Sequence, residues 1–367
     1  MENSGFERSD PAAGAWRAAD AAANRAGEAL RVIEDVVRFI LDDAELTRRV
    51  KQLRHDLSAV LAGDDLPQRV FLRDTPGDVG AGVEAAAALP RCDARDLVVA
   101  NAARAAQALR SLQECALLLV PAVAVQFEQL RYRLYAIERA AVGTIRAADR
   151  FQGIRLCVLV DGGRDLPAFA RLIESLLEAG VRMVQIRDKH LGVPALADRA
   201  RQAIAVARRR APEGGAIIVV NDRADVAAAV GADGVHTGAD DLPTVLARRV
   251  IGPRRILGRT AHDLAEARAA VIDGADYLGV GPCFPSVTKS FESFAAAEFI
   301  GAVAREISLP AFAIGGVTLE RIEALALLGV RRVAVASAVT GASDPAAAAA
   351  ALNERLNRLS ERDQPTP

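Results

Sequence analysis

The chain has 367 residues, of which 51% are hydrophobic and 25% charged, a composition typical of a soluble enzyme of about two or three domains. Its formal net charge of -1 excludes a polycationic surface for nucleic acid or for membranes. The cysteines are too scattered for a typical metal site or disulfide framework, and no secretory signal or membrane-spanning run is evident. A cytoplasmic enzyme is therefore expected.

The N-terminal region is expected to be helical from about Trp16, after a disordered segment at residues 1–15. Apolar side chains recur at helical spacing along one face, at Leu30, Ile33, Val37, Ile40 and Leu41. A second stripe is polar and consists of Asn24, Glu28, Arg31, Asp35 and Arg38. This periodicity predicts an amphipathic helix with one buried face and one polar face.

The N-terminal region also contains an internal repeat. Residues 25–35 (RAGEALRVIED) return as residues 104–114 (RAAQALRSLQE), and residues 51–57 (KQLRHDL) return as residues 128–134 (EQLRYRL). Both pairs occur in the same order, which favours duplication of a two-helix unit. We therefore expect an all-α helical bundle with pseudo-twofold symmetry over residues 16–145, its two copies joined by a crossover rich in turn residues.

Short apolar runs replace the long amphipathic helices around residues 139–152, where we place the domain boundary. A helical segment follows each run, and continuous apolar runs are typical of parallel strands covered by helices. The eight runs are residues 154–161, 181–188, 216–222, 234–237, 255–262, 277–283, 310–316 and 331–338. Their number and spacing predict an α/β fold, a (β/α)8 TIM barrel over residues 152–360.

Two acidic pairs follow neighbouring runs of this predicted barrel. Asn221-Asp222 ends the third run, and Asp240-Asp241 follows the fourth. The carboxyl ends of barrel strands meet in one mouth, so Asp222 and Asp241 are expected to converge. Two carboxylates there suit Mg²⁺, which accepts one or two carboxylates together with phosphate oxygens. From spacing alone, the alternative that each aspartate caps the helix that follows it is supported as well as the metal site.

Basic and small residues at other strand ends indicate phosphate sites. Arg187 and Lys189 follow the second run and offer a planar fork and a point charge. Gly315-Gly316 and Ser337 follow the seventh and eighth runs, where barrels commonly bind phosphate through backbone N–H groups. The alternative for the glycines is a tight turn. Two anionic sites in one mouth imply two phosphorylated small-molecule substrates.

Six ordered motifs in this half resemble thiamine-phosphate synthases: QIRDK, VNDRADVA, ADGVHTGADD, GRTAH, DYLGVGPCFPSVTK and AIGGV. The resemblance begins near residue 154 and continues to the C-terminal helix, and it implies Mg²⁺ on Asp222 and Asp241. The implied pyrimidine diphosphate site consists of Gln185, Ile186, Arg187, Asp188, Lys189, Asn221, Thr260 and Lys289. The implied thiazole phosphate site consists of Ser286, Val287, Thr288, Gly316, Ala336 and Ser337.

The resemblance also implies a reaction, in which the nitrogen of the thiazole phosphate, or of its carboxylated precursor, displaces diphosphate from the aminopyrimidine methylene. Catalytic roles are implied for Arg187, Lys189, Lys289 and Thr260. Thr260 stands where the family usually has serine, and it retains the hydroxyl. The alternative is a barrel that binds phosphorylated ligands without catalysis.

The N-terminal stretches DAAANRAGEALRVIEDVVRF and KQLRHDL resemble a domain fused to some of these synthases and associated with phosphorylation of hydroxymethylpyrimidine phosphate. ATP would be the phosphate donor, and Glu34 or Asp35 would hold Mg²⁺. The candidate binding residues are Asn24, Arg25, Glu28, Arg31, Arg54 and His55. The alternative is a module for homo-oligomerisation or docking whose charged stripe is simply solvated.

Overall fold

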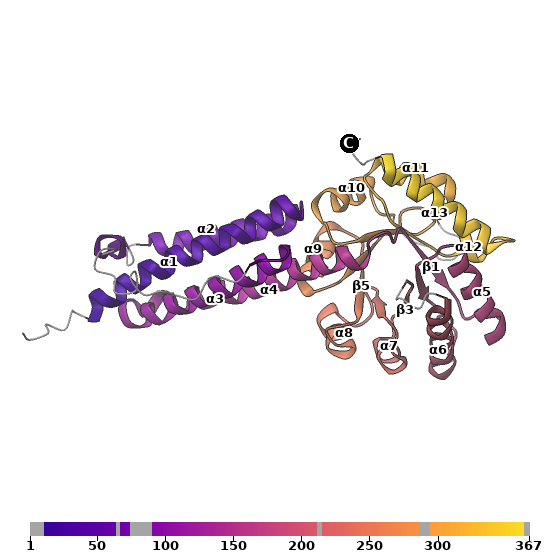
Figure 1. Cartoon of the computed structure of the whole chain (residues 1–367), viewed down its shortest axis with the longest axis horizontal. Helices are drawn as coiled ribbons and strands as arrows, with labels where there is room; N and C mark the ends of the chain where they lie inside the picture. Colours follow the sequence, from indigo (N-terminus) through magenta and orange to yellow (C-terminus); the bar gives the residue numbers. More distant parts are fainter. Residues whose placement is uncertain (1–10, 64–66, 74–89, 211–214, 286–293, 363–367) are drawn as a thin grey trace, which may run out of the picture. The chain divides into compact units, whose positions relative to one another are not determined.

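The computed structural model describes residues 11–63, 67–73, 90–210, 215–285 and 294–362 (Figure 1). The chain divides into two compact units, Met1–Ile145 and Arg146–Pro367, which we call the bundle unit and the barrel unit. Across the described residues, no helix is both long enough and apolar enough to cross a bilayer.

The described part of the bundle unit is helical. Its elements are α1 (Pro11–Asp35), the π-helix η1 (Val36–Ile40), α2 (Ala44–Ala62), η2 (Pro67–Leu72), α3 (Ala94–Leu119), η3 (Pro121–Val123) and α4 (Ala124–Arg150), which continues into the barrel unit. The expected start near Trp16 is too late, because α1 begins at Pro11. Proline suits a first helical position, and the alanines after it favour helix. Residues 1–10 lie outside the described residues.

The expected apolar stripe of α1 ends earlier than its sequence spacing predicts. Leu30, Ile33 and Val37 are buried, but Ile40 is 57% exposed. The reason is η1, where the Leu41 N–H bonds to the Val36 carbonyl at 3.0 Å across five residues instead of four. The extra residue in this turn rotates the following side chains off the buried face.

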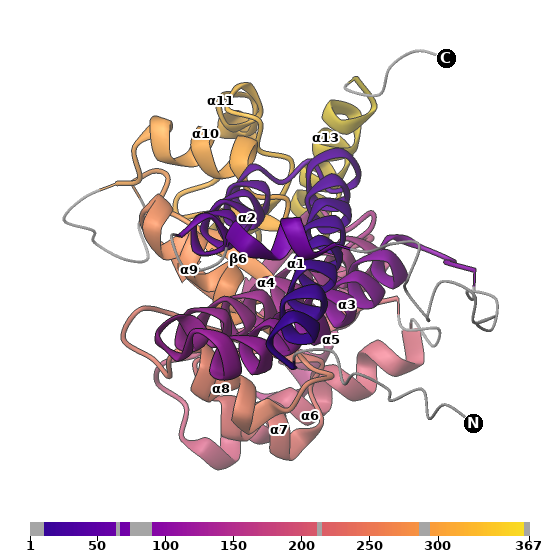
Figure 2. The ribbon, with the colours of Figure 1, turned by 90° about the vertical axis from the view of Figure 1, so that its left-hand side faces the viewer.

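The two sequence repeats make equivalent contacts in the structure. The long helices run alongside one another (Figures 1 and 2), and α1 packs on α3. In the first copy, Arg54 Nε donates to Glu34 Oε2 at 2.8 Å. In the second copy, Arg131 Nη2 donates at 3.5 Å to Gln113, which stands at the position of Glu34. The matching partners agree with duplication of a two-helix unit.

The barrel unit is a closed parallel barrel of eight strands in sequential order, which confirms the predicted fold. The strands are β1 (Leu156–Val160), β2 (Met183–Ile186), β3 (Ile217–Asn221), β4 (Gly234–Thr237), β5 (Ile256–Ala261), β6 (Tyr277–Val280), β7 (Ala311–Ile314) and β8 (Val333–Val335). Each lies within one of the expected apolar runs. β1 pairs with both β2 and β8, which closes the barrel.

Helices alternate with these strands around the barrel (Figure 1). They are α5 (Leu166–Glu178), α6 (Val193–Arg210), α7 (Ala224–Val230), α8 (Thr244–Ile251), α9 (Leu264–Asp273), α10 (Ala297–Glu306), η4 (Leu319–Arg321), α11 (Ile322–Leu327), α12 (Ser337–Thr340) and α13 (Pro345–Arg362). Strands such as β2 and β6 are buried at every residue, as their continuous apolar sequences predict.

One end of the barrel is filled by an aromatic cluster. The Phe151 ring lies 5.4 Å from that of Tyr277 and 6.0 Å from that of Phe312, between ring centroids. All three side chains are fully buried. This packing supports the barrel from within and leaves the opposite, carboxyl ends of the strands to form a site.

Candidate active site

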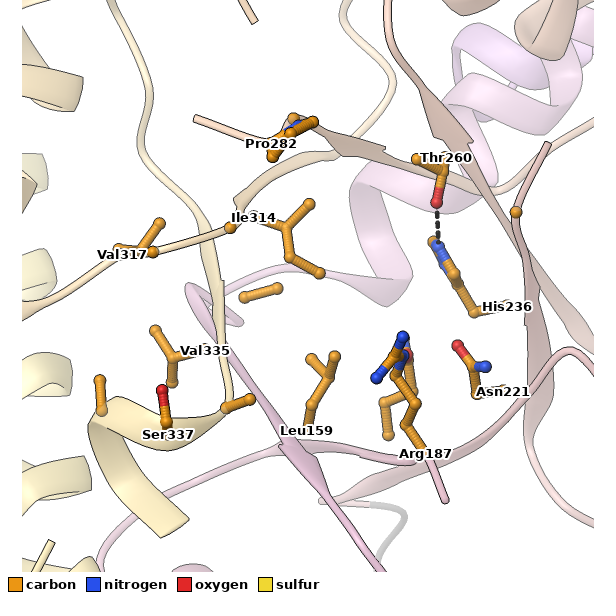
Figure 3. Close-up of a pocket in the computed structure, with 18 of the residues that line it drawn as sticks. Leu159, Arg187, Asn221, His236, Thr260, Pro282, Ile314, Val317, Val335 and Ser337 are labelled. Carbon is orange, nitrogen blue, oxygen red and sulfur yellow. Dashed lines mark hydrogen bonds between the residues drawn. The ribbon is translucent and has the colours of Figure 1, made fainter. Parts of the chain in front are cut away.

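A pocket of about 470 Å³ opens at the carboxyl ends of the strands (Figure 3). Residues from both halves of the barrel line it, and most of the sequence-predicted site residues are among them. Those residues are Gln185, Arg187, Lys189, Asn221, Asp222, Asp241, Thr260, Gly316, Ala336 and Ser337. The predicted residues Ser286, Val287, Thr288 and Lys289 lie outside the described residues.

Two predicted residues of the QIRDK motif do not line the pocket. The Ile186 side chain is fully buried in β2. The Asp188 carboxylate accepts hydrogen bonds from the backbone N–H groups of Gly162, His190 and Leu191, at 2.9, 2.7 and 3.0 Å. Asp188 therefore stabilises the loop that carries Arg187 and Lys189. The side chains of these two cationic residues line the pocket.

Backbone geometry brings the two predicted metal ligands together. Asp222 adopts a φ of 63°, and its N–H donates to the His236 carbonyl at 2.7 Å. Asp241 accepts a 2.7 Å bond from the Gly238 N–H. Burial and then the neighbouring Asp241 carboxylate raise the pKa of Asp222 to about 6, while Lys189 and Arg187 oppose the rise. The two carboxylates therefore meet beside cationic groups.

The alternative of two helix caps does not fit these positions. The residue before α7 is Arg223, and the residue before α8 is Pro243, so neither aspartate occupies an N-cap position. The described residues contain no group of three or more histidine, cysteine or acidic side chains that could hold a metal by themselves. Asp222 and Asp241 instead provide two neighbouring carboxylates, which could hold Mg²⁺ together with substrate phosphate oxygens.

The pocket floor contains a histidine that the sequence did not single out. His236 of β4 is buried and bonds through Nε2 to the Thr260 hydroxyl at 2.9 Å (Figure 3). Its Nδ1 lies 2.9 Å from the hydroxyl oxygen of Tyr277. Burial is the main cause that lowers the pKa of His236 to about 4, so the ring is neutral near pH 7.

The wall at the ends of β7 and β8 combines small residues with the apolar side chains of Ile314, Val317 and Val335 (Figure 3). Gly315 and Gly316 have φ values of 96° and 62°, which glycine adopts without strain. A side chain at Gly316 would overlap the carbonyls of Phe284 and Pro285. Ala336 and Ser337 face the same pocket from the end of β8. This wall leaves room for a ligand close to the backbone.

Comparison with known proteins gives a family match in each of the two units. A family profile described as thiamine monophosphate synthase matches residues 156–339. The thiamine-phosphate synthase of Rhodopirellula baltica is 37% identical over 358 residues, which cover 95% of this chain and 94% of that protein. The chain belongs to the thiamine-phosphate synthase family. A second profile, described as the ThiD2 family, matches residues 17–140.

Other relatives of this transferase family agree. The thiamine-phosphate synthase of Gloeobacter violaceus is 38% identical and covers 93% of this chain and 97% of its own length. Among solved structures, the thiamine phosphate pyrophosphorylase of Pyrococcus furiosus is 30% identical with a TM-score of 0.50, covering 56% of this chain and 97% of its own. The shorter protein matches about as much of the chain as the barrel unit occupies.

The bundle of this synthase-family chain separates its candidate residues into two groups. Arg31 and Arg54 converge on the buried Glu34, at 3.5 and 2.8 Å. The remaining candidates have exposed side chains, namely Asn24, Arg25, Glu28 and His55. Asp35 is also exposed, so of the two carboxylates considered for Mg²⁺ it is the one open to solvent.

Proposed function

We propose that the barrel joins an aminopyrimidine diphosphate to a thiazole phosphate, forming thiamine phosphate and releasing diphosphate with the help of Mg²⁺. The observation that carries this proposal is the division of the pocket into two differently built sides. One side gathers Arg187 and Lys189 with Asp222 and Asp241. The other side is the wall at the ends of β7 and β8, with Gly316 and Ser337. Each side suits one phosphorylated substrate.

The cationic side matches the needs of a departing diphosphate. Arg187 would bind two phosphate oxygens through its planar guanidinium, and Lys189 would add a point charge. Asp222 and Asp241 would hold Mg²⁺, which when bound supplies further neutralisation of the charge that develops on the leaving group. These groups favour breaking of the bond between the methylene carbon and diphosphate oxygen.

The opposite side needs only to position the attacking group. Backbone N–H groups at Gly316 and Ser337 would hold the phosphate tail of the thiazole, which aims the ring nitrogen at the methylene carbon. The nitrogen supplies the electron pair of the new bond, and the diphosphate leaves with the pair of the broken one. No side chain acts as a nucleophile in this scheme.

The test uses the full chain with the pyrimidine diphosphate, the thiazole phosphate and Mg²⁺. Thiamine phosphate and inorganic diphosphate should form in equal amounts. If each ligand binds in titration calorimetry while no product forms, the barrel is a phosphate-ligand binding module instead of a synthase.

For the bundle unit we propose phosphorylation of hydroxymethylpyrimidine phosphate by ATP, which would make the substrate of the barrel. The match to the ThiD2 family supports this, together with the arginines and acidic side chains of the first repeat. Phosphoryl transfer needs mainly positioning and charge neutralisation, which such residues can provide.

This second activity is measured with full-length Asp222→Ala, so that the diphosphate is made but not consumed. ATP, Mg²⁺ and the pyrimidine monophosphate should yield the diphosphate and ADP. Absence of product from a folded chain that self-associates would support an oligomerisation module instead. Light scattering measures whether the chain self-associates.

A further inference from the structure

A chain of hydrogen bonds crosses the floor of the pocket. The Gln185 side chain bonds to the Tyr277 hydroxyl, which lies 2.9 Å from His236 Nδ1. On the other side of the same ring, His236 Nε2 lies 2.9 Å from the Thr260 hydroxyl oxygen. Gln185 and Thr260, at the two ends, both line the pocket. A buried imidazole and a buried phenol therefore connect two residues that line the pocket.

The surroundings hold the two rings of this chain in place. A side chain at Gly258 would overlap the rings of His236 and Tyr277, and one at Gly279 would press on His236. The Tyr277 ring also packs against Phe151 and Phe312. Glycine at both positions gives the rings their space, and the aromatic cluster prevents them from swinging away.

The donor and the acceptor of each hydrogen bond at His236 can be assigned. Both ring nitrogens of His236 have a hydroxyl partner at 2.9 Å, and a neutral ring can accept from only one of them. The phenol of Tyr277 is more acidic than the alcohol of Thr260 and is therefore the stronger donor. The phenol hydrogen then has His236 Nδ1 as its acceptor. A neutral imidazole has one N–H, so the proton lies on Nε2 and is donated to the Thr260 oxygen. The Thr260 hydrogen remains to bond elsewhere.

We propose that His236 is a positioning residue, which fixes the Thr260 hydroxyl as a hydrogen-bond donor to the pyrimidine diphosphate. A free threonine hydroxyl rotates and can donate or accept. One that already accepts from a fixed ring N–H presents its own hydrogen toward the pocket. The inference rests on the proposed synthase reaction for its ligand, and it assigns His236 a role only through Thr260.

The direction of the chain is tested without any turnover. A long-range ¹H–¹⁵N spectrum of the full chain with labelled histidine distinguishes the two neutral tautomers, and His236→Gln identifies the signal among the four histidines. The expected result is a neutral ring with its proton on Nε2. A proton on Nδ1 would reverse the chain, leave Thr260 as an acceptor to the ligand, and overturn the proposal.

The positioning role is tested by a double-mutant cycle. Thr260→Val and His236→Leu should each lower kcat/KM for the pyrimidine diphosphate by about tenfold to a hundredfold, with KM for the thiazole phosphate unchanged. The double variant should be no worse than Thr260→Val alone, because His236 acts through the hydroxyl. His236→Gln should recover most activity, since its amide nitrogen can donate in place of Nε2.

Losses that add in the double variant would overturn the proposal, because they would mean that His236 acts independently of Thr260. A change in both KM values would point to a general distortion of the pocket and would also count against it. If the wild-type chain makes no thiamine phosphate, the proposed reaction fails, but the tautomer measurement and calorimetric binding of the pyrimidine diphosphate still decide the role of His236.

Discussion

Asp222 and Asp241 owe their proximity to the backbone more than to any side-chain preference. Asp222 has a φ of 63°, a left-handed conformation that aspartate tolerates better than most residues. Asp241 is held by the Gly238 N–H at 2.7 Å. Two carboxylates so placed repel each other, and burial adds to the cost of charging both. A divalent cation relieves this repulsion.

The first prediction concerns this pair. Asp222→Ala and Asp241→Ala should each lower kcat by about a hundredfold or more, because the leaving diphosphate loses part of its charge neutralisation. Steady-state rates with Mg²⁺ varied provide the measurement. Asp225→Ala is the control, since Asp225 is exposed, does not line the pocket and should be replaceable within about twofold. Normal rate and Mg²⁺ dependence in Asp241→Ala would remove that residue from the metal site.

A second prediction at this scale concerns Gly316. Gly316→Val introduces a side chain that overlaps the carbonyls of Phe284 and Pro285, at a φ of 62° that valine disfavours. The thiazole phosphate wall should therefore be distorted, which raises KM for the thiazole phosphate by about tenfold or more. KM for the pyrimidine diphosphate should stay near the wild-type value. The reverse pattern would show that the thiazole phosphate does not bind at the end of β7.

Several charged residues predicted from the sequence, such as Asp222 and Arg187, line the pocket, but the sequence did not single out the histidine beneath them. Asp222 and Arg187 follow apolar runs, and a barrel brings all such positions to one mouth. His236 lies inside a buried strand, where a histidine is more often a core residue. Its contacts with Tyr277 and Thr260 depend on the strand register. That register pairs His236 with Gly258, Gly258 with Tyr277, and Thr260 with Gly279. The apolar pattern does not specify that register.

At the scale of elements, β5 and β6 are tied together by a buried acid. Asp276 accepts hydrogen bonds from the Leu257 N–H at 2.8 Å and from Arg248 Nη2 at 2.5 Å. Arg248 also donates to the carbonyls of Gly274 and Arg255. The network lies before the start of β6, at the end of the barrel away from the pocket. It therefore contributes to stability without touching the site.

The third prediction follows from this network. Asp276→Ala should destabilise the barrel by about 3 kcal/mol, because Arg248 loses the partner of a buried ion pair. Urea unfolding followed by far-UV circular dichroism measures the change, and the fluorescence of the single tryptophan, Trp16, reports on the bundle separately. Asp225→Ala is the control, since its ion pair with Arg223 is exposed and should contribute less than about 1 kcal/mol. Equal effects of the two variants would contradict the prediction.

The two copies of the repeat in the bundle differ at one equivalent contact. Glu34 is buried against Arg54, whereas the second copy has Gln113 against Arg131. In the second copy an amide oxygen takes the place of the carboxylate, so that position accommodates an uncharged acceptor. Sequence comparison of the copies predicted this symmetry, but it did not predict η1, because a single extra residue in a turn leaves the apolar spacing unchanged.

The fourth prediction is therefore that Glu34→Gln is tolerated. Stability of the bundle, followed by Trp16 fluorescence, should change by less than about 1 kcal/mol, since the amide oxygen still accepts from Arg54. Glu34→Ala leaves the Arg54 guanidinium without this partner and should cost about 2 kcal/mol or more. Formation of the pyrimidine diphosphate should survive in Glu34→Gln. A folded Glu34→Gln chain without that activity would instead give the carboxylate a catalytic role.

At the scale of the whole molecule, the chain combines two units that have separate cores and separate family matches. The curated relatives from Rhodopirellula baltica and Gloeobacter violaceus match across nearly the full length, so both units occur together in them. The proposed reactions are consecutive, because the diphosphate made by the bundle is the substrate of the barrel. Joining them in one chain keeps their amounts equal.

The last prediction is that the two reactions are linked through a released intermediate. Wild-type chain given the pyrimidine monophosphate, ATP, Mg²⁺ and the thiazole phosphate should accumulate free diphosphate first, and thiamine phosphate should appear after a lag. The physical reason is that each unit has its own core and its own set of charged residues, so each reaction can proceed without the other. Asp222→Ala should accumulate the diphosphate and stop there. Filtrate from that reaction, freed of ATP, should then supply the wild-type barrel. Thiamine phosphate that forms without a lag and without detectable free diphosphate would show direct transfer between the units instead.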